Sequence, residues 1–104
     1  MAQIQGSDVR KVVVACEAGM GSSVLLVTQL RDRLKGTDAE VIHSPVSRVP
    51  ADADVIVCHR GLEATARKIA PDKVVVPFDM FLGDPAFDRV VEGIKDGKVI
   101  EGQP

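Results

Sequence analysis

Tryptophan and tyrosine are absent from this sequence, and its aromatic residues are three phenylalanines. Proteins that stack nucleic-acid bases need exposed aromatic rings, so this composition argues against a single-strand nucleic-acid binder. Positive charge is not in excess either, because 13 Lys and Arg stand against 15 Asp and Glu, for a net charge of −2. Electrostatics therefore gives no reason to expect a nucleic-acid partner.

Long apolar runs and paired cysteines are missing as well. No apolar stretch approaches the roughly 18–20 residues of a membrane span, and the first residues lack the apolar core of a signal peptide. We therefore expect a cytoplasmic protein without direct membrane insertion. Cys16 and Cys58 form neither a disulfide framework nor a CxxC pair, and the only histidines are His43 and His59. We expect reduced thiols and neither a metal nor another cofactor.

Apolar runs and amphipathic segments alternate along the 104 residues. This alternation predicts an α/β fold, in which helices on both faces cover a parallel sheet. The expected strands are Val12–Cys16, Ala39–Ile42, Asp54–Cys58 and Lys73–Val76, and the expected helices are Ser22–Lys35, Leu62–Ala70 and one from Asp84-Pro85 to Gly97. We expect a single three-layer domain over residues 1–104, Rossmann-like or flavodoxin-like, with a four-stranded parallel sheet in the order 2-1-3-4. The expected irregular parts are tails at about Met1–Asp8 and Lys98–Pro104, outside a core of about 10–97, and a loop at Ser44–Ala53.

The segment CEAGMGSS directly follows the first expected strand. Cys16 ends that strand, and the glycines and serines after it form a turn that leads into a helix. Backbone N–H groups in such a turn, together with the positive end of the helix, bind an anion and favour the thiolate of a nearby cysteine. Cys16 is therefore predicted to be a nucleophile, with a phosphate-binding loop made of Glu17, Ala18, Gly19, Met20, Gly21, Ser22 and Ser23.

Other roles for a cysteine at a strand end are also open. Such a residue is often a small core hydrophobe, and this is the preferred role for Cys58, because no glycine–serine turn follows it. Metal binding and thioredoxin-like redox chemistry both lack a second nearby cysteine. A dinucleotide-binding fingerprint fits poorly, because Val24 stands where its third glycine belongs.

A cysteine-dependent phosphatase of the low-molecular-weight type is the main chemical alternative. Its loop resembles this one but has an arginine at the helix start, which clamps the phosphoryl group in the transition state. Ser22 occupies that position here, and residues 17–30 contain neither Arg nor Lys. The loop is thus suited to holding a phosphoryl group on sulfur without hydrolysing it, as a phosphoryl relay requires.

The cysteine loop resembles the phosphocysteine loop of the enzyme IIB components of the phosphoenolpyruvate-dependent sugar phosphotransferase system. The mannitol-type branch has the pattern C-D-A-G-M-G-S-S, so that Glu17 replaces an aspartate. Further matches over about residues 10–97 are the acidic, apolar run Asp52–Val57, the pair His59-Arg60 and the pair Phe81-Leu82. A second departure is Gly61, which stands where an aspartate is usual.

What the resemblance implies is a two-step relay. Cys16 accepts a phosphoryl group from a phosphohistidine of enzyme IIA and donates it to a sugar or hexitol, with mannitol the first candidate, bound by a separate membrane enzyme IIC. His59 and Arg60 are expected near Cys16, where they would contact a partner or steer the phosphate. No metal or cofactor is implied, and we expect a monomer. A noncatalytic module that senses phosphorylation is the alternative from another class.

Overall fold

The central sheet in the computed structural model, which describes residues 3–16, 22–79 and 85–101, has four parallel strands in the order β3-β2-β4-β5. The strands are β2 (Lys11–Cys16), β3 (Glu40–Pro45), β4 (Val55–His59) and β5 (Val74–Phe78). The chain starts in the middle with β2, crosses to one edge with β3 and returns to the other side with β4 and β5. The predicted order 2-1-3-4 is confirmed.

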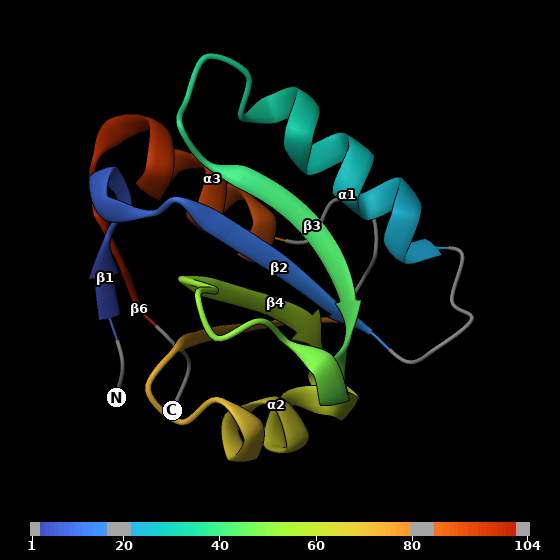
Figure 1. Ribbon diagram of the computed structural model, residues 1–104. Helices are drawn as coiled ribbons and strands as arrows, with labels where there is room; N and C mark the ends of the chain where they lie inside the picture. The colour runs from blue at the N-terminus through green and yellow to red at the C-terminus, as the bar shows by residue number, and fades with distance from the viewer. Residues whose placement is uncertain (1–2, 17–21, 80–84, 102–104) are drawn as a thin grey trace.

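Helices cover both faces of this sheet (Figure 1). They are α1 (Ser22–Arg33) and α3 (Pro85–Asp96) on one face and α2 (Glu63–Ile69) on the other. Val12 and Val14 of β2 pack in the core shared with α1 and α3, whereas Val13 and Ala15 pack in the core beneath α2. Because successive strand residues point to opposite faces, two covered faces require the continuous apolar runs seen in the sequence.

Two glycines with positive φ follow the ends of helices α1 and α3. Gly36, at φ +85°, follows the end of α1, and Gly97, at φ +71°, follows α3 directly. Both lie in the left-handed region that favours glycine at a helix C-terminus. Pro85 begins α3, in line with the predicted helix start at Asp84-Pro85, and Asp84 itself lies outside the described residues.

The terminal segments correct the expectation of two tails. β1 (Gln3–Gln5) and β6 (Val99–Glu101) pair in an antiparallel two-stranded sheet, in which Ile4 lies opposite Ile100. Ile100 is buried and Ile4 packs against the same core. Strands this short show no periodicity in sequence, so the apolar residue at the centre of each was the only available signal.

The segment expected as a loop, Ser44–Ala53, is more ordered at its start. Ser44 and Pro45 end β3, which extends beyond the predicted strand, and Val46–Arg48 form a 3-10 turn. The buried Ser44 hydroxyl donates to the carbonyl of Pro45 and to that of Arg48, both at 3.0 Å. The side chain therefore ties the turn to the end of the strand.

Candidate functional site

The four parallel strands of the central sheet end along one edge, and the candidate residues lie there. Ala15 of β2 is paired with Cys58 of β4. Cys16 and His59 are the next residues on these two neighbouring strands and are the last residues of each. The sequence prediction that the strands ending near Cys16 and Cys58 are neighbours is thus confirmed. The ligand sites of such sheets lie at this carboxyl edge.

Helix α1 begins at the same edge of the sheet. Figure 1 shows its first turn, which starts at Ser22, on the side of the molecule where the tip of β2 ends. The N-terminus of a helix carries about half a positive charge, which favours an anion. Glu17–Gly21, the remainder of the predicted phosphate-binding loop, lie outside the described residues, and Ser22 and Ser23 open the helix.

His59 is exposed at the end of β4, and contacts with Gly61 and Phe78 help to orient it. The backbone N–H of Gly61 donates to its Nδ1, with 3.2 Å between the two nitrogens. Its ring meets the ring of Phe78, the paired residue on β5, edge to face, with 5.8 Å between centroids. These contacts set the direction of the imidazole at the carboxyl edge.

Arg60 pairs with Asp79, a residue that is not among the predicted site residues. Arg60 Nε donates to Asp79 Oδ1 at 2.8 Å, and Nη2 donates to Oδ2 at 3.3 Å. The two side chains are about half exposed, at 52% and 61%, so the pair contributes little to stability. It nevertheless places the guanidinium between the ends of β4 and β5. A carboxylate directly after the neighbouring strand was the only sequence signal for this partner.

Cys58, the cysteine one residue before the end of β4, is fully buried. Its side chain packs beneath α2 with Ala15 and Ala66. Burial raises the pKa of the Cys58 thiol to about 11, and the Glu63 carboxylate adds to this effect, while the Arg67 guanidinium opposes it. A thiol with this pKa is protonated at neutral pH, which confirms the predicted core role.

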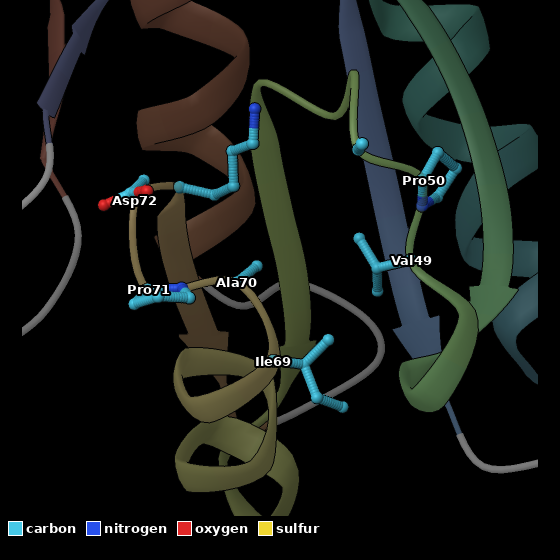
Figure 2. Close-up of a pocket in the computed structure, with 8 residues that line it drawn as sticks. Val49, Pro50, Ile69, Ala70, Pro71 and Asp72 are labelled. Carbon is cyan, nitrogen blue, oxygen red and sulfur yellow. The ribbon is translucent and has the colours of Figure 1, made fainter.

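A cleft of about 280 Å³ lies at the opposite, amino edge of the sheet (Figure 2). Val49, before β4, and Ile69, at the end of α2, point toward each other across it. The remaining lining residues are Pro50, Ala51, Ala70, Pro71, Asp72 and Lys73. None of the predicted site residues within the described part of the chain lines this cleft, which lies at the opposite edge of the sheet from them.

The described helices include none that is long and apolar enough to cross a membrane. By its fold, the chain is a flavodoxin-like α/β domain with a cysteine at the carboxyl end of a central strand. Residues 11–92 match the family model described as "PTS system, Lactose/Cellobiose specific IIB subunit". The chain belongs to this family, which confirms the resemblance identified in the sequence.

Curated relatives agree with this family. The chain is 35% identical over 95 residues to the "PTS system mannitol-specific EIICB component" of Halalkalibacterium halodurans, which is 89% of the chain and 20% of that relative. It is 39% identical over 86 residues to the "PTS system mannitol-specific cryptic EIICB component" of Escherichia coli K12, which is 81% of the chain and 18% of the relative. It is 33% identical over 102 residues to the "PTS system mannitol-specific EIICBA component" of Pasteurella multocida, which is 96% of the chain and 16% of that relative. The chain therefore spans about a fifth of the length of these relatives or less.

Proposed function

We propose that this chain is the IIB phosphoryl carrier of a sugar phosphotransferase system and acts in the cytoplasm. Cys16 accepts a phosphoryl group from a phosphohistidine of enzyme IIA and passes it to a hexitol, with mannitol the first candidate, bound by membrane enzyme IIC. The observation that carries the proposal is the position of Cys16, at the carboxyl end of the central strand β2 and before α1, in a chain of the IIB family. The names of the relatives join IIB with IIC, and in one case with IIA as well.

The relay consists of two displacements at phosphorus. In the first, the Cys16 sulfur attacks, an S–P bond forms and the N–P bond of the phosphohistidine breaks. The electron pair of that bond returns to the imidazole nitrogen. In the second, a sugar hydroxyl oxygen attacks, an O–P bond forms and the S–P bond breaks. The sulfur leaves as the thiolate, which is the starting state, and the hydroxyl proton passes to water.

The start of α1 supports this chemistry electrostatically. Positive potential at a helix N-terminus stabilises both the thiolate and the phosphoryl oxygens, and no metal is required for that. In the proposed site, the backbone N–H groups of residues 18–23 bind the phosphoryl group, and the hydroxyl of Ser23 adds a donor. His59 and Arg60 lie at the same edge of the sheet, where they would face a partner or steer an incoming phosphate.

Intact-mass spectrometry tests the proposal. The purified protein is incubated with phosphoenolpyruvate and the upstream phosphodonors, including enzyme IIA. We expect a mass increase of one phosphoryl group in the natural chain and in Cys58→Ala, and none in Cys16→Ser, whose hydroxyl is far less acidic than a thiol. A phosphoryl group that persists in Cys16→Ser, or that never appears in the natural chain, would overturn the proposal.

The phosphatase alternative makes the opposite prediction about hydrolysis. Because Ser22 stands where that chemistry has an arginine, p-nitrophenyl phosphate should be turned over at no more than the background rate. Release of p-nitrophenol that disappears in Cys16→Ser would favour the phosphatase. The background is set by Cys16→Ser itself, which keeps the length of the loop.

A further inference from the structure

His59 projects from the face of the sheet that α1 covers. Along β4, Val55 and Val57 pack in the core shared with α1 and α3. His59 follows in the same phase, and its ring contacts Phe78. Phe78 in turn packs against Phe87 of α3, with 5.0 Å between ring centroids. The imidazole therefore lies on the α1 and α3 side, at the carboxyl edge.

The hydrogen bond from Gly61 favours the tautomer of this imidazole with its proton on Nε2. Nδ1 accepts the Gly61 N–H at 3.2 Å, so it carries no hydrogen. A neutral imidazole with an accepting Nδ1 holds its proton on Nε2. The edge-to-face contact with Phe78 sets the plane of the same ring. His59 is thus an oriented imidazole that can donate a hydrogen bond through Nε2.

Chain connectivity brings the candidate nucleophile to the same place. β2 lies beside β4, and neighbouring strands are about 4.8 Å apart. Cys16 and His59 each follow the paired residues Ala15 and Cys58. The chain passes from Cys16 to α1, which begins at Ser22 and packs on the His59 side of the sheet. Cys16, the last described residue before α1, therefore lies beside His59 on the neighbouring strand.

We propose that His59, through its Nε2–H, donates a hydrogen bond to the phosphoryl group carried by Cys16. This role rests on the proposed function. A single N–H donor suits an intermediate that must survive until its acceptor arrives, because it binds a phosphoryl group less strongly than the bidentate arginine of a phosphatase does.

Two substitutions separate the hydrogen bond donated by Nε2 of His59 from the one that its Nδ1 accepts from Gly61. In His59→Asn, the side-chain oxygen can still accept the Gly61 N–H, but no donor reaches the position of Nε2. In His59→Gln, the amide N–H₂ reaches that position, while the contact with Gly61 is weakened. A donor role predicts that Gln preserves function and Asn does not, and a purely structural role predicts the reverse. His43→Asn is the matched control, because His43 is the other histidine and is exposed on the edge strand β3.

The experiment follows phosphoryl transfer from enzyme IIA to Cys16 and records the ³¹P resonance of the phosphorylated protein. We expect His59→Asn to slow the transfer about two- to tenfold, the range for losing one hydrogen bond, and to shift the resonance. His59→Gln and His43→Asn should remain within about twofold of the natural chain and keep its resonance. Thermal unfolding of each variant shows that it is folded.

The outcomes distinguish the inference from the proposed function. If the natural chain takes up no phosphoryl group on Cys16, the proposed function falls, and the inference with it. If all variants are phosphorylated but His59→Asn has the transfer rate and resonance of the natural chain, only the role of His59 is wrong. The same holds if His59→Gln loses as much of the transfer rate as His59→Asn does. An unchanged ³¹P resonance together with slower transfer in Asn would place the effect in docking of IIA, and this also overturns the inference.

Discussion

The thiol of Cys58 is buried among apolar side chains on the α2 side of the sheet, and its pKa is raised to about 11. A thiolate in this place would lack solvation and would face the Glu63 carboxylate. Because the thiolate is the reactive form, Cys58 is inert toward electrophiles while the protein is folded. Because the folded protein disfavours this thiolate, ionisation of Cys58 at high pH favours unfolding.

Cys58 should make the protein less stable in alkaline solution. Folding raises its pKa from 9.0 to about 11, so its contribution is complete below pH 9 and is lost as the pH rises toward 11. The expected loss is at most about 3 kcal/mol. Urea unfolding of the natural chain and of Cys58→Ala against pH measures it, because the difference between them cancels the titration of lysines. Parallel curves would show that the thiol ionises as readily in the fold as outside it.

Single residues were predictable where the signal is local. Cys16 was assigned to a strand end because an apolar run stops there and a glycine–serine segment follows. The partner of Arg60 was not predicted, because Asp79 is 19 positions away and reaches it only through the pairing of β4 with β5. The orientation of His59 was also missed, since it depends on Phe78 of the neighbouring strand.

At the scale of elements, the β1–β6 ribbon is joined to α3 by a close backbone contact. The N–H of Gly6 donates to the carbonyl of Lys98 at 2.7 Å. A Cβ at Gly6 would lie 1.7 Å from the backbone oxygen of Gly93. This oxygen belongs to the helix backbone and cannot move aside as a side chain would. Only glycine fits at this approach, which explains why the ribbon can lie so close to the helix.

Gly6→Ala should therefore destabilise the domain by about 2 kcal/mol or more, since either the ribbon or α3 must shift. Ser7→Ala, the exposed neighbour, is the control and should change stability by less than about 0.5 kcal/mol. Urea unfolding measures both. The site lies at the other edge of the sheet, so Gly6→Ala should still accept phosphate at temperatures where it is folded. A Gly6→Ala protein as stable as the control would mean that the contact is looser than the geometry shows.

The strand β3 is protected along its outer edge. Glu40 N–H donates to the carbonyl of Arg10 before β2, so Val41, the next residue, turns its backbone groups outward. The Val41 carbonyl accepts from Arg31 Nε of α1 at 2.7 Å. By the same alternation Pro45 also lies at an outward position, where its missing N–H costs no ladder bond. The alternation explains how a proline fits into β3, a strand that the sequence pattern predicts to end at Ile42.

At the scale of the whole molecule, the two edges formed by the ends of the parallel strands carry different features. The carboxyl edge holds Cys16, His59 and Arg60, while the amino edge lies beside the β1–β6 ribbon and the cleft of Figure 2. The strand order was predictable, because continuous apolar runs between amphipathic helices leave few topologies. The ribbon was not, because its stability comes from packing of Ile4 and Ile100 on a core built by other elements.

The whole chain is expected to be a monomer, because both outer strands of the sheet resist pairing with another copy. An unpaired strand edge is a template for association, and prolines or charged side chains placed on it prevent that. β3 carries Pro45 and the Arg31 contact, and the other outer strand, β5, carries Pro77.

Sedimentation velocity over a range of protein concentrations measures the state of association. The natural chain should sediment as one monomeric species, and so should Arg33→Ala, the matched control on the same helix, whose arginine pairs with Asp88 of α3. The double variant Arg31→Ala, Pro45→Thr exposes the edge and supplies a new N–H, so it should form dimers or larger species as its concentration rises. A natural chain that already dimerises would contradict the expectation of a monomer. A double variant that remains monomeric would show that Pro45 and Arg31 are not what prevents pairing along β3.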